Sequence, residues 1–190
     1  MLIKMKLEIK QLLFLNSFFA FGINLFAPLY AIYVQHIDSS IIHVGAIWTV
    51  YIFSVGIFAL LFTKVKNRSS YSGLFLILGF LFRAIGWLGY IFATSIWHLY
   101  LIQLLLAAGE AFGTPAYNHL YSSFLDKMQH GSEWNISTSI NSFIVGTASF
   151  VGVVIVDKFG FPALFGCMIV LSFVSTLLAL RYKKIFWQSS

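Results

Sequence analysis

An acidic residue, Glu110, lies inside a long apolar stretch, residues 96 to 121. A carboxylate at the centre of a bilayer helix costs about 2.5 to 3.5 kcal/mol even on insertion scales, so such residues usually face a protein interior, a partner or a water-filled path. Gln103, Thr114 and Tyr117 share its helical face, because successive members are 7, 4 and 3 residues apart. This stripe predicts substrate or proton binding; the alternative is hydrogen bonding between membrane helices.

The stretch that holds Glu110 is one of several that could cross a membrane. Of the 190 residues, 59% are hydrophobic and only 9% are charged, and the mean hydropathy is +0.88. Such values exclude an ordinary soluble domain and indicate an integral membrane protein embedded in a lipid bilayer. About 20 apolar residues span the hydrocarbon core. Spanning helices are expected at about 11–35, 41–62, 71–93, 96–121, 135–156 and 161–181, as a single bundle over residues 1–190.

The basic residues follow the apolar stretches in an alternating pattern. Of the 12 lysine and arginine residues, Arg83 lies inside a stretch and Lys158 in an odd-numbered connection, whereas the others, including Lys64, Lys66 and Arg68, lie in even-numbered connections or near the termini. By the positive-inside rule, both termini are predicted to be cytoplasmic in a multi-pass protein of the plasma or inner membrane. This distribution explains the net charge of +6 without nucleic-acid binding.

The two halves of the chain share a weak repeat. Sliding the sequence by 87 positions places "FGINLFAPLY" (21–30) on "AGEAFGTPAY" (108–117), which matches Pro28 with Pro115 and Tyr30 with Tyr117. Because each half holds three helices, the second half must cross the membrane with opposite polarity. The prediction is an inverted 3+3 repeat, an architecture found chiefly in transporters, in which paired Gly or Pro interruptions point to the binding site.

The stretch "LYLIQLLLAAGEAFGTPAYNHLYSSF" and the segment "GSEWNISTSINSFIVGTASFVGVVIVDKFGFPALF" resemble the fourth helix, and the fifth helix with the turn into the sixth, of the major facilitator superfamily. The resemblance covers essentially the whole chain and implies an all-α membrane protein that forms one six-helix half of that fold. Two departures stand out. In the family signature between helices 2 and 3, Thr63 stands where an acidic residue is usual and Lys66 where a glycine is usual. In the fourth helix, Gln103 stands where members of the family often have an arginine.

In the resembling family the first and fourth helices line the substrate cavity, which adds candidate residues. Asn16 and Asn24 lie in the first helix, and Asn141 lies near the cytoplasmic end of the fifth. The resemblance implies substrate or proton binding for these amides, with hydrogen bonding between helices as the alternative. If Glu110 were buried without a partner, the cost of burying its charge would favour proton uptake near neutral pH, as a proton-coupled carrier requires.

Arg83 is the other charged residue inside a helix and the natural counter-ion for Glu110. Counting about 1.5 Å per residue places Arg83 about 18 Å from the cytoplasmic start of its helix and Glu110 about 10 Å from the same face. This difference in depth, about 8 Å at the same rise per residue, disfavours a direct ion pair. Arg83 is therefore expected to brace the bundle or to reach through a polar seam, with the Glu110 pair as the alternative.

A solitary half of this family would expose its cavity face to lipid. Because the two halves of such transporters are related by an axis along the membrane normal, the resemblance implies parallel pairing, either in a homodimer or with a separately encoded second half. The expected function is secondary-active transport of a small solute by alternating access. The alternative is a six-helix protein that transports nothing, such as a truncated carrier, an assembly factor or a regulatory partner.

The sequence argues against an enzyme. Of the 5 histidines, only His119 lies well inside a predicted helix, and no glycine-framed serine motif accompanies it. Phosphate-binding loops and clusters of metal-ligating residues are absent from the sequence, so neither a metal nor another cofactor is expected. The lone Cys167 excludes an internal disulfide.

Overall fold

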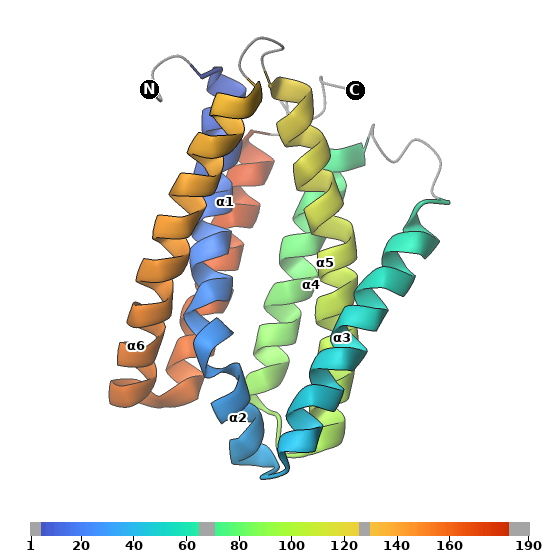
Figure 1. Ribbon diagram of the computed structural model, residues 1–190, viewed down its shortest axis with the longest axis vertical. Helices are drawn as coiled ribbons and strands as arrows, with labels where there is room; N and C mark the ends of the chain where they lie inside the picture. The colour runs from blue at the N-terminus through green and yellow to red at the C-terminus, as the bar shows by residue number, and fades with distance from the viewer. Residues whose placement is uncertain (1–4, 65–70, 126–129, 183–190) are drawn as a thin grey trace.

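The computed structural model describes residues 5–64, 71–125 and 130–182, and every regular element within them is helical (Figure 1). Within these described ranges, five stretches are long and apolar enough to cross a membrane, which is consistent with the expected all-α membrane protein. The elements in chain order are α1 Leu7–Phe26, the 3₁₀ turn η2 Ala27–Leu29, α2 Tyr30–Ile37, α3 Ile41–Phe62, α4 Ser72–Ile91, α5 Ile96–Phe124 and α6 His130–Arg181.

A proline divides the first apolar stretch. Pro28 lies inside η2, where α1 passes into α2. Proline has no backbone N–H and its ring clashes with the preceding turn, so it breaks regular helical hydrogen bonding at this point. The adjoining residues remain helical, and the whole stretch runs from Leu7 to Ile37, longer than the 11–35 expected.

α6 is continuous from His130 to Arg181 except at Gly160, whose φ of 80° and ψ of 174° are not helical. Only glycine adopts such a conformation without strain. Figure 1 shows that the two limbs of α6, orange and red, run in opposite directions from this turn. The sequence predicted a connection between residues 156 and 161; instead the helical hydrogen bonding continues on both sides of one glycine. The first limb also begins five residues earlier than expected.

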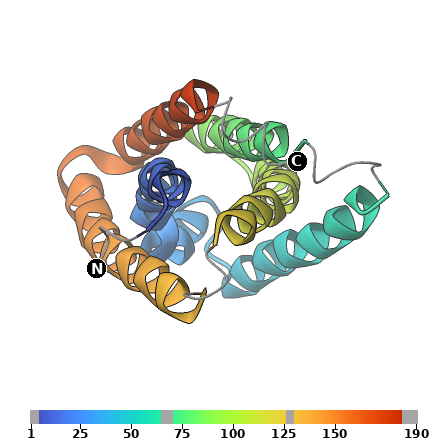
Figure 2. The ribbon, with the colours of Figure 1, turned by 90° about the horizontal axis from the view of Figure 1, so that it is seen from above.

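Close backbone contacts fix how the helices pack. α1 packs on α6, α4 packs on both α5 and α6, and α3 packs on α5 (Figure 2). A Cβ atom added at Gly79 of α4 would lie 2.5 Å from the Gly113 Cα atom of α5. A Cβ atom at Gly152 of α6 would clash with the Leu25 backbone carbonyl of α1. Small residues therefore allow these backbones to approach, as is common between membrane helices.

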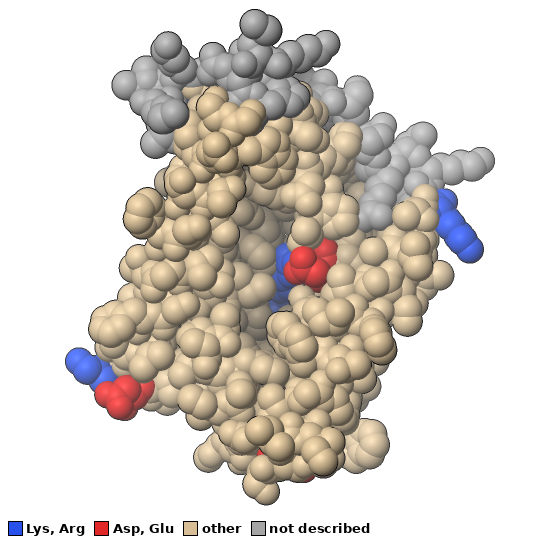
Figure 3. Space-filling model, in the orientation of Figure 1, with Lys and Arg blue, Asp and Glu red and all other residues tan. Residues whose placement is uncertain are grey.

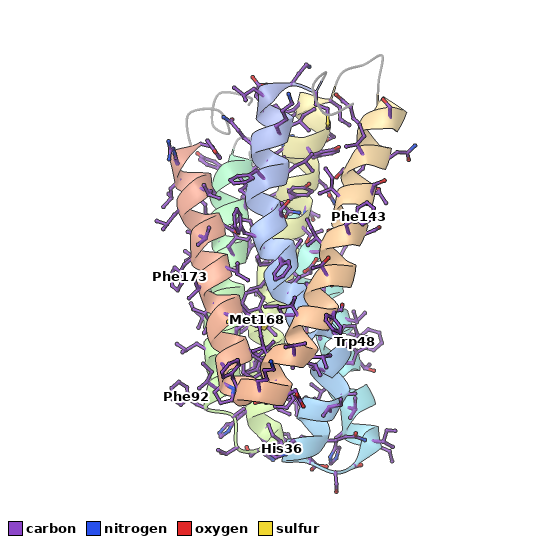
Figure 4. The ribbon with its side chains drawn as sticks, turned by 90° about the vertical axis from the view of Figure 1, so that its left-hand side faces the viewer. His36, Trp48, Phe92, Phe143, Met168 and Phe173 are labelled. Carbon is purple, nitrogen blue, oxygen red and sulfur yellow. The ribbon has the colours of Figure 1, made fainter. Side chains whose placement is uncertain are left out.

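Large apolar side chains cover the outside of the bundle. Figure 4 shows Phe143 and Phe173 on the outer sides of the two limbs of α6, where their exposed fractions are 78% and 49%. Inside, an aromatic cluster packs at the turns of α1–α2 and of α6: Phe26, Tyr33, Tyr90, Phe161 and Phe165. The Tyr33 hydroxyl in this cluster donates to the Tyr90 carbonyl of α4. An apolar exterior around a packed interior is the arrangement required in lipid.

Candidate functional site

A hollow opens on one face of the bundle between α1 and α5 (Figure 3). Its largest part, the first cavity, has a volume of about 560 Å³. The second and third cavities measure about 200 Å³ and 280 Å³. Asn24 and Arg83 line both the first and the second, while Asn16, Tyr117 and Asn141 line both the second and the third. The three cavities therefore form one hollow along the bundle.

An ion pair lies in the wall of this hollow. The Arg83 guanidinium of α4 donates through Nη2 to the Glu110 carboxylate of α5. Figure 3 shows acidic and basic atoms side by side in the hollow at mid-height of the molecule, which agrees with this pair. The Arg83 side chain is only 4% exposed, and that of Glu110 is 24% exposed. The sequence-based estimate that disfavoured a direct pair is wrong.

The register of α4 against α5 explains the error. Gly79 lies against Gly113, Gly86 against Leu106, and Gly89 against Ile102. Between these contacts of two antiparallel helices, residue 83 must lie level with residues 109 and 110. The expected depths of Arg83 and Glu110 assumed that the cytoplasmic ends of their two helices lie at the same depth. In the structure α5 continues to Phe124, and the glycine contacts set the register of α4 against α5.

Several neighbours complete the surroundings of the ion pair. The Thr114 hydroxyl donates to the second carboxylate oxygen of Glu110, and Arg83 Nη2 lies 3.4 Å from that hydroxyl. The Arg83 guanidinium also lies over the Phe19 ring, 4.7 Å from its centroid. The Tyr51 hydroxyl of α3 lies close enough to the Glu110 carboxylate to donate a hydrogen bond to it. Glu110 is thus paired in this state, so the condition under which an isolated carboxylate would take up a proton is not met.

Two further predicted residues line the hollow while making internal hydrogen bonds. Gln103 is buried, and its Nε2 atom donates to the Tyr30 hydroxyl at 3.0 Å, which joins α5 to α2. The Asn24 amide donates to the Ala20 carbonyl one helical turn earlier, at 2.7 Å. Gln103 therefore links two helices, whereas Asn24 bonds within its own helix, and both side chains still contact the first cavity.

The other end of the hollow gathers the remaining polar candidates. Tyr117 stacks on Tyr121, with ring centroids 5.9 Å apart. Asn16 of α1 and Asn141 of α6 face the same two cavities, and neither side chain has a hydrogen-bond partner within the described part of the chain. These two amides are therefore available to a ligand, unlike that of Gln103.

The two matched prolines are not equivalent in the structure. Pro28 lies in a 3₁₀ turn and lines the first cavity. Pro115 lies within the uninterrupted helix α5 and is exposed, so the expected interruption of α5 is wrong. Membrane helices tolerate proline where neighbouring groups compensate for the missing hydrogen bond. Of the predicted basic turn, Lys64 is exposed just after α3, while Lys66 and Arg68 lie outside the described residues.

Sequence reasoning missed the aromatic wall of the first cavity. Trp48 and Tyr51 of α3 and Trp87 and Tyr90 of α4 all line it. The spacing gave only a weak signal: Trp48 and Tyr51 are one turn apart on a helix, and Trp87 lies one turn after Arg83. This spacing does not distinguish a cavity wall from ordinary packing, because aromatic residues are common on apolar helices.

The comparisons with known proteins identify a family. The sequence matches the family model described as Major Facilitator Superfamily over residues 12–185, nearly its whole length. No curated protein matches the chain. Among the described residues no group of three or more His, Cys, Asp or Glu side chains could hold a metal ion.

Proposed function

Because this chain belongs to the major facilitator superfamily, whose members are transporters rather than enzymes, we propose that it is half of a secondary-active transporter for a small solute. It pairs with a second six-helix half and moves its substrate by alternating access. The substrate binds in the hollow that Asn24, Arg83 and Asn141 line.

The Arg83–Glu110 ion pair is the observation that carries this proposal. Charged side chains are costly inside a membrane, and where they occur they face a bundle interior or a water-filled path and mark routes for ions or substrates. This pair joins two helices at the wall of a hollow and not in a sealed core. In an alternating-access cycle the hollow opens first to one side of the membrane and then to the other. Such a cycle needs a contact that can break between these two states.

The proposed architecture has six spans in an inverted 3+3 repeat. Each limb of α6 would cross the membrane separately, because the two limbs run in opposite directions from Gly160 (Figure 1). Helices α1–α2, α3 and α4 would then correspond to α5 and the two limbs of α6. In support, Tyr30 and Tyr117, which the repeat matches, lie at opposite ends of the hollow.

Pairing with a second half is proposed because the hollow lacks a wall on its open face. Trp48 and Asn141, at its two ends, are exposed to the surroundings of the bundle. Since the distribution of basic residues fixes one orientation, two copies would pair in parallel. A separately encoded second half would serve the same purpose.

Proton coupling through Glu110 is part of the proposal. Protonation of the carboxylate would remove the partner charge of Arg83 and favour separation of α4 from α5. The side chain is 24% exposed, which gives a proton a route from the hollow.

A transport assay that does not require the substrate to be known in advance tests the proposal. Proteoliposomes that contain the chain, with and without a proton gradient, are incubated with a cell extract, and the lumen contents are identified by mass spectrometry. We expect at least one solute to accumulate only with the gradient. Glu110→Gln should abolish this dependence, whereas Asp157→Asn, at an exposed position of α6, should retain it.

Two outcomes would revise the proposal in different ways. Full gradient dependence in Glu110→Gln would remove Glu110 from the coupling mechanism while leaving transport intact. Failure of any solute to accumulate, with or without a gradient, would favour the alternative function, a six-helix partner protein that transports nothing.

A further inference from the structure

We propose that the ligand of the hollow is an uncharged molecule with an aromatic group at one end and hydrogen-bonding groups at the other. The inference deepens the proposed function by naming the chemical class of substrate, and it rests on that function only for the assumption that the hollow binds a ligand. Three features of the hollow carry it: the balance of its charges, the composition of its first cavity and that of the other two.

The charges in the wall of the hollow balance each other. Arg83 is paired with Glu110 and lies over the Phe19 ring, and it is only 4% exposed. Glu110 also accepts from Thr114. A cationic ligand that took Glu110 would leave a buried guanidinium that cannot lose its proton. An anionic ligand that took Arg83 would leave the carboxylate without its cation. An uncharged ligand avoids both costs.

The first cavity is built to hold a flat apolar group. The Trp48 ring lies 5.5 Å from that of Tyr30 and 5.4 Å from that of Tyr51, measured between centroids, and it is 50% exposed. Trp87 and Tyr90 close the same cavity from α4. Its volume, about 560 Å³, is within the usual range for sites of small organic ligands. An aromatic ring would stack among these side chains at favourable centroid separations.

The second and third cavities offer hydrogen bonds without charge. Asn16 and Asn141 reach them from α1 and α6 and have no partner within the described residues. Each amide supplies two donors and an acceptor. Because Asn24 and Arg83 line both the first and the second cavity, one ligand can extend past the ion pair from the aromatic end to the amide end.

A matched set of small probes tests the inference. Phenylacetamide, phenylacetate and 2-phenylethylamine share a benzyl group and are neutral, anionic and cationic at pH 7, while acetamide lacks the ring. Binding to the full chain in nanodiscs is measured by saturation-transfer NMR and by the unfolding midpoint, with empty nanodiscs as the control for partition into lipid. We expect phenylacetamide to bind at least tenfold more tightly than either ion or acetamide.

Two pairs of variants locate the binding. Trp48→Leu should weaken phenylacetamide binding about tenfold, whereas Trp97→Leu, at an exposed position of α5 outside the three cavities, should not. Asn141→Leu should also weaken it, whereas Asn135→Leu, six residues earlier on the same helix and outside the cavities, should not. The unliganded unfolding midpoint of each variant shows whether it folds.

The inference is overturned if either ion binds as tightly as phenylacetamide, if phenylacetamide fails to bind, or if Trp48→Leu and Asn141→Leu leave its binding unchanged. These outcomes are separate from the test of transport. Specific phenylacetamide binding by a chain that transports nothing would contradict the proposed function and leave the inference standing. Gradient-driven accumulation of a charged solute alone would support the proposed function and contradict the inference.

Discussion

Arg83 and Glu110 are unequal partners, because the arginine side chain is 4% exposed and the glutamate side chain is 24% exposed. Removing the carboxylate leaves a buried charge that cannot be neutralised, whereas removing the arginine leaves a carboxylate that water or a proton can reach. We therefore expect Glu110→Leu to lower the free energy of unfolding by about 3 kcal/mol and Arg83→Met to lower it by less. Reversible denaturant titration in lipid bicelles measures both.

The double variant provides the control for this prediction. Glu110→Leu with Arg83→Met removes both charges at once, so its stability should lie closer to that of the natural protein than the sum of the two single changes implies. Asp157→Leu, at an exposed position outside the hollow, should have little effect. Additive losses in the double variant would show that the two side chains do not depend on each other.

At the scale of single residues the sequence predicted which polar residues line the hollow better than it predicted which of them contact one another. Gln103, Thr114 and Tyr117 follow from the helical spacing around Glu110, and they do contact the hollow. The Arg83 pairing could not be derived by counting residues from helix ends, because the approach of Gly79 to Gly113 sets the register. Trp48 and Tyr51 were missed because aromatic residues in an apolar helix carry no distinct signal of a cavity.

The glycine contacts between α4 and α5 position the ion pair. A Cβ atom at Gly79 would lie 2.5 Å from the Gly113 Cα atom and 3.0 Å from the Gly109 carbonyl oxygen, so neither neighbour can move without shifting a helix backbone. We expect Gly79→Ala to lower the unfolding free energy by about 1 to 3 kcal/mol, the usual cost of overpacking. The same bicelle titration measures it.

Gly56→Ala is the matched control, because a Cβ atom there has no neighbour within 4 Å. It should be neutral, or stabilising by up to about 1 kcal/mol from the higher helix propensity of alanine. Equal effects of the two changes would mean that the contact between α4 and α5 does not limit stability.

Helix positions were largely predictable, and their ends were not. Apolar length alone located the long stretches, since about 20 apolar residues are needed to cross the membrane. The turn at Gly160 was expected as a longer connection, because sequence gives no measure of how few residues a reversal requires. Pro28 and Pro115 look equivalent in the repeat, yet only Pro28 interrupts its helix, a difference that depends on tertiary packing.

The arrangement of the whole chain predicts which ends of the bundle face the cytoplasm. Lys64 and Lys158 lie at opposite ends, after α3 and at the turn of α6, and both are exposed. In a Cys167→Ser background, we expect a membrane-impermeant maleimide to label Lys158→Cys on intact cells and Lys64→Cys only after permeabilisation. Labelling in the opposite order would place the termini outside and contradict the positive-inside assignment.

At the scale of the molecule, composition indicated the membrane class. Two segments, residues 99–124 and 131–165, carried the family resemblance, which the family match confirms. The family resemblance implied a cavity face exposed to lipid, and the structure adds which residues line that hollow, among them Trp48 of α3 and Asn141 of α6. In the proposed function a second half completes that wall.

The mass of the complex that the chain forms in its native membranes tests the central claim most directly. Native mass spectrometry of the chain, extracted with surrounding lipid at low protein density, should give either twice its 21.5 kDa or the mass of the chain with one further six-helix protein. Either result would supply the second wall that the hollow requires. A single chain without a partner would contradict the account, because Arg83 and Glu110 would then border a hollow that cannot close.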